Sequence, residues 1–374
     1  MLKRNKWENT SREILSLAGI KIDGNNPWDI RVHDKQFYQR VLAQRSLGLG
    51  ESYMDGWWDC EKLDEFFFRV LSTQIESKIR KNRALLFEVL LARVYNMQSK
   101  KRAFQIGEKH YDLGNELFRI MLDKRMVYSC AYWKDSQTLD EAQESKLELI
   151  CRKIGLQPGM RILDIGCGWG SLVKYAADKY KVTGVGITVS KEQAEFAKTI
   201  CLGLPVEIRL QDYRDVNEQF DRVVSVGMIE HVGYKNYRTY MEVVHKCLKE
   251  GGLFLLHTIG GNKSVTSVDP WMNRYIFPNG MLPSIKQLGS AIEGLFVMED
   301  WHNFSADYDR TLMAWHSNLE KRWDEIKAKY TERFHRMWEY YLLSCAGAFR
   351  ARQNQLWQIV LSKKGVAGGY IPIR

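Results

Sequence analysis

The sequence predicts a doubly wound α/β fold, in which helices cover both faces of a parallel sheet. Two observations support this prediction. From Met160 onward, short apolar runs alternate with helical patterns, and the first run leads into the glycine-rich turn LDIGCGWGS. Strands that alternate with helices build parallel sheets, because each helix carries the chain back to the edge from which the next strand starts. A small N-terminal helical domain and helical C-terminal additions complete the expected architecture.

The N-terminal part, residues 1–100, is expected to form the helical domain, and residues 101–374 the larger one. Helical patterns occur in SREILSLAGI, where a serine can cap the helix, in FYQRVLAQRSLGLGESYMDGWWDC and in LDEFFFRVLSTQI. Between residues 77 and 102, eight Lys or Arg side chains accompany the single acid Glu88, and apolar residues recur at helical spacing. A basic amphipathic helix of this kind can lie in a membrane interface. The alternative is a core-facing helix followed by a charged linker.

The larger domain is expected to contain five parallel strands. They are MRILDIGC (160–167), KVTGVGIT (181–188), VEIRLQDY (206–213), FDRVVSVGMI (220–229) and LFLLHTIG (253–260). Helical patterns lie between them, in SLVKYAADKY (171–180), SKEQAEFAKTICLGL (190–204) and YRTYMEVVHKCLKE (237–250). Residues 261–295, which contain FPNGMLPS, are expected to form a turn-rich insertion. After Tyr308 the pattern predicts long helices rich in Trp and Tyr.

Composition limits the class of protein. The chain has 374 residues, 45% of them hydrophobic, and its seven cysteines include no metal-type C-x-x-C pair. We therefore expect a globular protein from a reducing compartment, without a structural metal. No apolar run approaches the ~18 residues that a membrane-spanning helix needs, and a cytoplasmic protein is expected. The net charge of +10 favours anionic partners, for which both nucleic acid and anionic lipid qualify.

The glycine-rich turn indicates a nucleotide-like ligand. Gly166, Gly168 and Gly170 lie at the first strand-to-helix turn, where the absence of side chains lets the backbone approach a ligand closely. The dinucleotide pattern G-x-G-x-x-G would require glycine where Ser171 stands. The acidic residue expected about 20 positions later is also missing, since Gly186 occupies that region. The sequence therefore disfavours NAD.

The same turn is similar to motif I of the class I methyltransferases, which use S-adenosyl-L-methionine (SAM). The arrangement D-x-G-x-G-x-G is followed by QDY at the end of the third strand, where this fold holds adenine. Most such enzymes bind the ribose through an acidic residue after the second strand. Here that strand ends in Thr188, so Thr188 and Gln193, or water, would have to supply those hydrogen bonds.

Polar side chains at the ends of the fourth and fifth strands indicate where chemistry occurs. SVGMIEHVG places Glu230 at the end of the fourth strand, and LLHTIG places His257 and Ile259 at the end of the fifth. The carboxyl ends of parallel strands form the ligand crevice of this fold. Taken singly, Glu230 could cap the following helix and His257 could be a structural histidine. We interpret His231 as structural or supporting.

Seven motifs together resemble one family. EKHYDLGNELF, YSCAYW, LDIGCGWG, TVSKEQ, GMIEHVG, LLHTIG and YIFPNGMLPS are similar to those of the cyclopropane-fatty-acyl-phospholipid synthases, a SAM-dependent family that includes the mycolic acid cyclopropane synthases. The likeness is dense between residues 104 and 310. It implies a class I SAM-methyltransferase (Rossmann-like) catalytic domain over 101–374 and a lipid- or membrane-docking domain over 1–100. The family's reaction transfers a methylene from SAM to the cis double bond of unsaturated acyl chains in membrane phospholipids, giving cyclopropane fatty acids.

The resemblance also implies roles for individual residues. In this family a bicarbonate ion serves as general base, and its holders here would be Cys130, Glu230, His257, Ile259 (through its backbone) and Tyr308. The SAM-binding positions would be Tyr128, Ser129, Ile162, Asp164, Gly166, Cys167, Gly168, Gly170, Thr188, Val189, Gln193, Gln211 and Asp212. The implied partners are unsaturated phospholipids and the anionic inner face of the membrane, to which a cytoplasmic homodimer would bind peripherally. Neither nucleic acid nor a metal is implied.

The expected chemistry accounts for the aromatic residues around Cys130. An alkene that attacks the sulfonium methyl becomes a carbocation, and the new methyl must lose a proton before the ring closes. Such a site needs a base, an anion or aromatic faces near the cation, and no water. YSCAYW (128–133) is therefore interpreted as a collar in which Tyr132 and Trp133 help to close the site. The alternative is a plain core segment.

Three other functions remain open from the sequence. A SAM methyltransferase acting on a soluble amine or on RNA would suit the basic charge, but the Asn/Asp-Pro-Pro-aromatic motif of amine methylases is missing. A relative that only methylates the lipid, and a non-catalytic lipid-binding protein with a vestigial SAM fold, would share most of the motifs.

Cys345, in LLSCAGAFR, is a further candidate nucleophile, although no His adjoins it and the mechanism needs no covalent intermediate.

Overall fold

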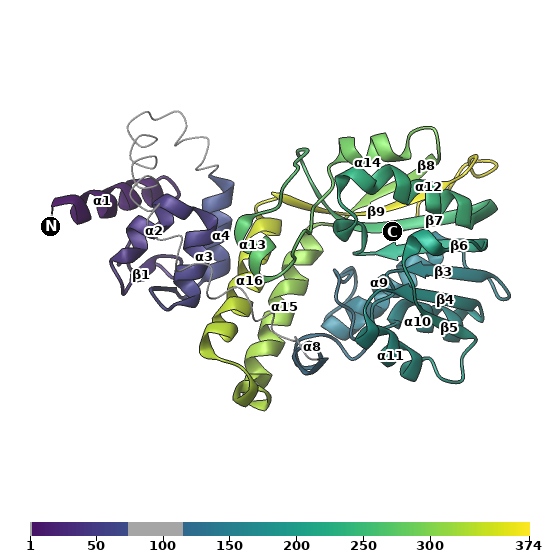
Figure 1. The fold of residues 1–374 in the computed structure, drawn as a ribbon, viewed down its shortest axis with the longest axis horizontal. Helices are drawn as coiled ribbons and strands as arrows, with labels where there is room; N and C mark the ends of the chain where they lie inside the picture. The colour runs from purple at the N-terminus through teal and green to yellow at the C-terminus, as the bar shows by residue number, and fades with distance from the viewer. Residues whose placement is uncertain (1, 74–114) are drawn as a thin grey trace. The chain divides into compact units, whose positions relative to one another are not determined.

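The computed structural model describes residues 2–73 and 115–374, which belong to two compact units (Figure 1). The first unit takes residues from 1–121, 269–278 and 312–353, and the second takes 122–268, 279–311 and 354–374. The domain boundary predicted near residue 100 and the basic stretch 77–102 lie outside the described residues. Among the described residues, no helix combines the length and the apolar character that crossing a membrane requires.

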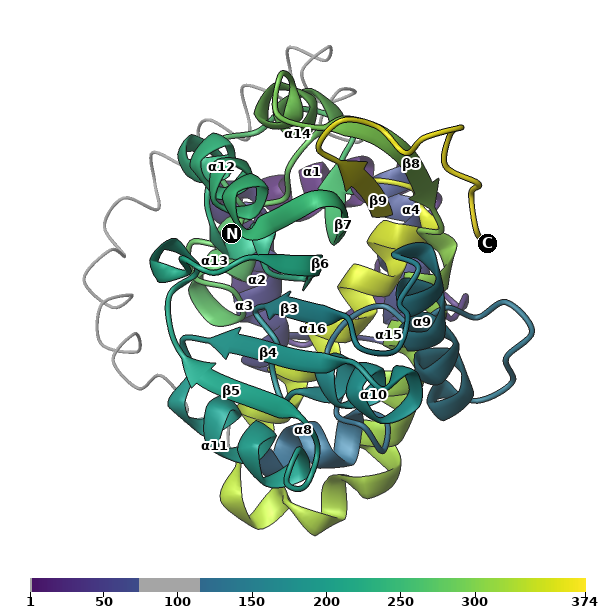
Figure 2. The ribbon, with the colours of Figure 1, turned by 90° about the vertical axis from the view of Figure 1, so that its right-hand side faces the viewer.

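The second unit is built on a seven-stranded sheet in the order β5-β4-β3-β6-β7-β9-β8 (Figure 2). The strands are β3 (Arg161–Ile165), β4 (Thr183–Thr188), β5 (Val206–Leu210), β6 (Phe220–Val226), β7 (Leu248–Gly261), β8 (Val297–Asn303) and β9 (Asn354–Ser362). Strands β3 to β7 pair in parallel, as the apolar runs predict. β9 lies antiparallel between β7 and β8. The carboxyl ends of the parallel strands consequently meet at one edge of the sheet.

Helices cover both faces of this sheet, which confirms the doubly wound prediction (Figure 1). One face carries α9 (Leu139–Lys153), α10 (Ser171–Tyr180) and α11 (Lys191–Ile200), and the other carries α12 (Tyr237–Cys247) and α14 (Ile285–Ile292). Ile162 of β3 packs with apolar residues of α9 and α10, whereas Leu163 and Ile165 pack with those of α12 and α14. The two cores arise because successive side chains of a strand point to opposite faces.

The structure differs from the prediction in the C-terminal part. The long helices expected after Tyr308 are present as α15 (Ala306–Arg322) and α16 (Glu332–Arg350). Residues 354–362, however, form β9, so the expectation of helix is wrong there. Gln355 through Ser362 are all buried, as is typical of an interior strand with neighbours on both sides. The insertion at 261–295 contains α13 (Pro270–Tyr275) and α14 as well as turns.

The described residues of the first unit are mainly helical. Its other helices are α1 (Leu2–Ser16), α2 (Gln36–Gln44), α3 (Ser46–Met54), α4 (Leu63–Ser72) and α8 (Asn115–Met121). Ser11, expected to cap a helix, lies inside α1. The sequence also gave no indication of the short antiparallel pair formed by β1 (Ile30–Val32) and β2 (Trp58–Cys60). Helical patterning therefore located most of this unit but missed its two-stranded sheet.

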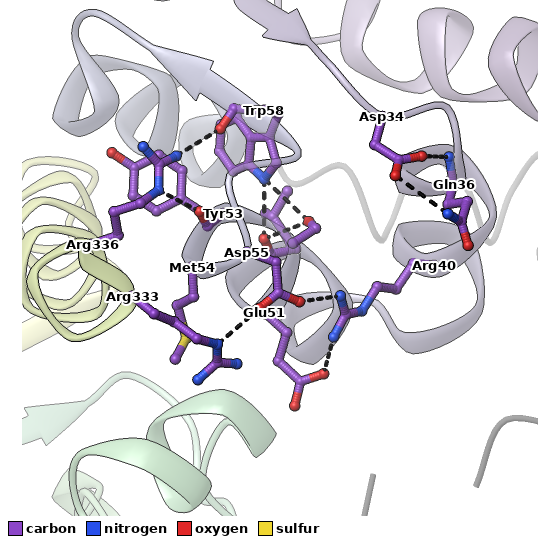
Figure 3. A network of polar contacts seen from close by, with 12 residues as sticks. Asp34, Gln36, Arg40, Glu51, Tyr53, Met54, Asp55, Trp58, Arg333 and Arg336 are labelled. Atoms are coloured by element: carbon purple, nitrogen blue, oxygen red, sulfur yellow. Dashed lines mark hydrogen bonds and ion pairs between the residues drawn. The ribbon is translucent and has the colours of Figure 1, made fainter. Parts of the chain in front are cut away.

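Ion pairs tie α2, α3 and α16 together in the first unit (Figure 3). The Arg40 guanidinium lies 2.5 Å from Glu51 Oε2 and 2.7 Å from Asp55 Oδ2. Arg333, on α16, reaches the other oxygen of the Asp55 carboxylate at 2.8 Å. Arg336, one turn further along α16, donates to the backbone oxygen of Tyr53 at 2.6 Å. Because three elements share these charges, α16 is fixed against the N-terminal helices by directional contacts as well as by apolar packing.

Candidate active site

The glycine-rich turn leaves bare backbone at the carboxyl end of β3. Gly166, Gly168 and Gly170 have φ values of +79°, +54° and +84°, a region that only glycine adopts readily. The backbone N–H of Gly166 donates to the carbonyl oxygen of Ile187 at 2.9 Å, which fixes the turn beside β4. A Cβ at position 166 would lie 2.7 Å from Met228 Cγ, whereas one at position 168 would have no atom within 4 Å. The turn thus offers open space at Gly168, next to a sheet edge.

Thr188 and Gln193 are joined at the carboxyl end of β4. The Thr188 hydroxyl donates to Gln193 Oε1 at 3.0 Å, and the Thr188 carbonyl accepts from Gln211 N at 3.0 Å. Asp212 forms an ion pair with Arg214 at 2.7 Å. From the sequence, Thr188 and Gln193 are expected to bind the ribose, and Gln211 and Asp212 the adenine. The structure places these residues at or just after the neighbouring carboxyl ends of β4 and β5.

The other expected SAM positions differ in exposure. Ile162 is fully buried in the core, Cys167 is buried beside α11, and Asp164 is buried at the end of β3. Val189, by contrast, is 77% exposed, which is unusual for an apolar side chain at the end of a strand. Its exposed surface adjoins the edge where the sequence places the nucleotide. Tyr128 directly precedes the buried part of the collar.

The collar segment 128–133 is held against α15 by the Thr311 hydroxyl and the Asp307 carboxylate. Thr311 Oγ1 accepts hydrogen bonds from the backbone N–H of Ala131 at 3.1 Å and from Trp133 Nε1 at 2.9 Å. The backbone N–H of Trp133 donates to Asp307 Oδ2 at 2.7 Å. Cys130 and Ala131 are fully buried. Tyr308, the expected anion holder on α15, is buried one helical turn before Thr311.

Neither candidate cysteine is a thiolate at neutral pH. Burial raises the pKa of the Cys130 thiol well above its ordinary value, and the nearby Asp307 raises it further. The Cys130 thiol donates to the carbonyl of Ala131 at 3.2 Å. Burial also raises the pKa of Cys345, on α16 in the first unit, to about 12. Both thiols are therefore protonated, and Cys130 is suited to donating a hydrogen bond rather than to nucleophilic attack.

Glu230 is anchored to β7 by one of its two oxygens. Oε1 accepts from the backbone N–H of Ile259 at 2.8 Å, while Oε2 is buried and finds no hydrogen-bond partner in the described part of the chain. The carbonyl of Glu230 accepts from Met281 N at 2.7 Å, which fixes the short helical turn that carries it. Burial raises the pKa of the carboxyl to about 7, against the hydrogen bond from Ile259, which lowers it. Glu230 is therefore poised between its charged and neutral forms near neutral pH.

His257 is a neutral, buried imidazole. It lies on β7 with 1% of its surface exposed, and Gln358 Nε2, on β9, lies 3.2 Å from its Nδ1. With the amide as donor, Nδ1 accepts and the ring proton resides on Nε2, which is buried and has no partner within residues 2–73 and 115–374. Burial lowers the pKa of His257 well below its ordinary value, and the charge of Lys146 lowers it further. Among the described residues, Nε2 is thus a buried donor without an acceptor, and it belongs to the strand whose Ile259 N–H binds Glu230.

Aromatic contacts connect this histidine with the collar. The Phe304 ring lies 5.9 Å from the ring of His257 and 5.3 Å from that of Tyr132, both in edge arrangements. Lys146 influences the pKa of His257, and Cys130 influences that of Lys146. Cys130, Glu230, His257 and Ile259 therefore lie within the same buried region, around the carboxyl ends of β6 and β7. This arrangement is the one that the interpretation of 128–133 as part of a site requires, and that interpretation stays a prediction.

Three residues of this region were not anticipated from the sequence. Lys146 donates to Ser129 Oγ at 2.8 Å, Thr311 holds the collar, and Gln358 orients His257. The sequence contains only weak indications that Lys146 and Gln358 belong to the site. Lys146 occupies the buried face of an amphipathic helix together with Leu147 and Ile150, where a lysine is rare, and Gln358 interrupts an otherwise apolar run.

Comparison with known proteins identifies what the chain resembles. The family model of the mycolic acid cyclopropane synthetases matches residues 98–359. The cyclopropane-fatty-acyl-phospholipid synthase of Escherichia coli K12 is 57% identical over 365 residues, which are 98% of this chain and 95% of that protein. These matches include every motif on which the resemblance was based.

Solved structures agree in fold and in sequence. The cyclopropane synthase MmaA2 from Mycobacterium tuberculosis is 33% identical, with a TM-score of 0.64 over 70% of this chain and 98% of its own. The mycolic acid cyclopropane synthase CmaA1, solved in complex with SAH and CTAB, is also 33% identical, with a TM-score of 0.62 and the same coverage. A class I methyltransferase fold is therefore confirmed.

Proposed function

Since the chain belongs to the mycolic acid cyclopropane synthetase family, we propose that it converts cis double bonds of unsaturated acyl chains in membrane phospholipids into cyclopropane rings. It is a SAM-dependent enzyme of the cyclopropane-fatty-acyl-phospholipid synthase class, within the methyltransferases. The observation that carries the choice of substrate is the 57% identity to the E. coli phospholipid enzyme over 98% of this chain. The mycolic enzymes, by comparison, match about 70% of it.

The proposed reaction moves one carbon and one proton. The π electrons of the alkene form a bond to the sulfonium methyl, and the C–S electrons remain on sulfur. The resulting carbocation sits on the acyl chain, and the new methyl then releases a proton as the second C–C bond closes the ring. Residues of this chain contribute by excluding water and by surrounding the cation with aromatic faces, among them Tyr132 and Phe304.

Two unused polar atoms support an anion site. His257 Nε2 is a buried donor and Glu230 Oε2 a buried oxygen, and both lack partners among the described residues. Leaving such atoms unpaired is costly, so a ligand that offers both an acceptor and a hydroxyl donor would satisfy them. Bicarbonate has both groups, and when bound it would supply the general base that accepts the methyl proton. The S–H of Cys130, which donates to the carbonyl of Ala131, would have to turn from it to donate to the ion. Ile259 already positions Glu230 through its backbone N–H.

The product decides between ring formation and simple methylation. The enzyme would be incubated with unsaturated phospholipid vesicles and SAM carrying a fully deuterated methyl group, and the lipid products would be identified by mass spectrometry. Ring closure removes one deuteron, so the cyclopropane should retain two, whereas a methyl-branched product retains three. Three retained deuterons, or transfer to a soluble amine or RNA instead of lipid, would contradict the proposed function.

The role of bicarbonate has a separate test. Carbonate-free assays should be slower than normal and should recover on addition of bicarbonate. Cys130→Ser keeps a donor but changes the geometry of the anion site, so its rate should depend more steeply on added bicarbonate. If both proteins are indifferent to bicarbonate, a side chain such as Glu230 is the base instead.

Membrane docking is proposed from the sequence. Basic residues near an anionic surface each contribute about 1 kcal/mol of binding, and the stretch 77–102 carries eight of them. Replacing Lys78, Arg80, Lys81 and Arg83 with serine should weaken sedimentation with anionic vesicles at low salt, and the defect should shrink as salt screens the charges. Unchanged binding at low salt would exclude this stretch as the docking element. Association as a homodimer remains a prediction, to be checked by light scattering.

A further inference from the structure

A buried lysine of the second unit contacts Ser129, one of the residues expected to bind SAM. Lys146, on α9, has 1% of its surface exposed. Its ammonium has three donors, and within the described residues the only acceptor that it reaches is Ser129 Oγ, at 2.8 Å. No carboxylate of the described chain forms an ion pair with it. An ammonium that is removed from water with donors left over is costly unless a ligand completes its surroundings.

The neighbouring acids do not complete these surroundings. Asp123 influences Lys146 electrostatically, but its carboxylate already accepts from the backbone N–H groups of Val127 and Arg125, each at 2.9 Å. Asp164 is the other carboxyl group that acts on Lys146, and burial raises its own pKa to about 7, so it only partly carries charge at neutral pH. The site therefore has a deficit of negative charge.

The position of Lys146 and Ser129 relative to the glycine turn indicates which ligand supplies the missing negative charge. Asp164 lies two residues before Gly166, at the end of β3, so Lys146 is close to the start of the turn. Because Ser129 Oγ accepts from Lys146, its own hydroxyl proton remains available to donate. Ammonium and hydroxyl together would recognise a carboxylate, whereas they would repel a cation.

We propose that Lys146 and Ser129 bind the α-carboxylate of the methionine part of SAM. The inference rests on the proposed use of SAM and adds to it a specific residue, Lys146, that neither the motifs nor the family likeness assigns. The negatively charged end of the SAM amino acid then lies beside Lys146. Its positively charged groups lie toward Asp164 and the open turn, so the zwitterion meets charges of opposite sign at both ends.

Binding calorimetry with two unreactive ligands tests the proposal. The ligands are S-adenosylhomocysteine and its decarboxylated analogue, which differ only in the carboxylate. The proteins are wild type, Lys146→Met, and Lys153→Met as the matched control. Lys153 lies on the same helix and is equally buried, but its ammonium contacts His302 Nδ1 at 2.9 Å rather than Ser129.

We expect only Lys146→Met to lose the preference for S-adenosylhomocysteine over its decarboxylated analogue. Wild type and Lys153→Met should prefer S-adenosylhomocysteine by at least about tenfold. Lys146→Met should bind it about 10- to 100-fold more weakly, in line with the loss of charge-assisted hydrogen bonds, and should bind the decarboxylated analogue almost as wild type does. If Lys146→Met does not fold, Lys146→Gln takes its place.

Other outcomes identify which idea fails. Equal binding of the two ligands by wild type, or an equal loss for both ligands in Lys146→Met, would overturn the carboxylate assignment and leave Lys146 with a structural role. Failure of wild type to bind S-adenosylhomocysteine at all would instead contradict the proposed use of SAM.

Discussion

Glu230→Gln is expected to flatten the pH dependence of stability. Burial raises the pKa of Glu230 from 4.5 to about 7 in the folded protein, and unfolding restores the ordinary value. Between these values the folded state binds more protons than the unfolded state, so the free energy of unfolding falls as the pH rises through this window. Each pKa unit corresponds to about 1.4 kcal/mol, so this single group should cause a decline of about 3 kcal/mol from pH 4.5 to pH 7.

Glutamine keeps an oxygen for the Ile259 N–H but does not titrate, so the variant should lack this decline. The constant cost of burying the new amide protons cancels when the difference between the two proteins is followed across pH. The assay is urea unfolding monitored by Trp fluorescence, with the exposed Glu192→Gln as control. A difference between wild type and Glu230→Gln that stays constant with pH would refute the raised pKa. Turnover should also fall about 100-fold, while SAM affinity should change little.

Four further variants have defined outcomes. Cys345→Ala should keep most activity, because its thiol is protonated; inactivity with intact SAM binding would mean that the mechanism lacks a step. Gly166→Ala and Gly168→Ala should both lose SAM affinity by calorimetry, because φ values of +79° and +54° strain an alanine. A Cβ at 166 would also lie 2.7 Å from Met228 Cγ, and one at 168 would enter the open space proposed for the ligand. Thr311→Val should lower the free energy of unfolding by about 3 kcal/mol, because two buried donors lose their acceptor; unchanged urea unfolding would contradict this account of the collar.

The parallel part of the sheet was predictable because each strand is a short apolar run that ends at a turn or at the start of a helical pattern. The motif LDIGCGWGS marks the end of β3 specifically, and the strands and helices that follow can be assigned by counting from it. β9 was not predictable in the same way. NQLWQIVLS follows a long helix, and an apolar run of this length fits a buried strand or a helix equally well. Only its pairing with β7 and β8 decides the matter.

In the site, residues within motifs were predictable and residues that support them were not. Glu230 and His257 follow apolar runs at the sheet edge, where polar side chains are conspicuous. Lys146 and Gln358 lie inside secondary-structure elements, and their functional environment exists only after segments distant in sequence have packed together. A lysine within a helix is usually on its solvated face, so its burial beside Ser129 can be learned only from the fold.

The late position of β9 in the chain has a consequence for biosynthesis. A ribosome makes β3 to β7 well before residues 354–362, and N-terminal segments generally fold first during synthesis. Until β9 emerges, β7 lacks its second neighbour and His257 lacks the Gln358 amide. A nascent or prematurely terminated chain could therefore assemble the glycine turn without an oriented imidazole. A chain that stops before residue 354 is therefore expected to be inactive, because both the sheet and the orientation of His257 depend on β9.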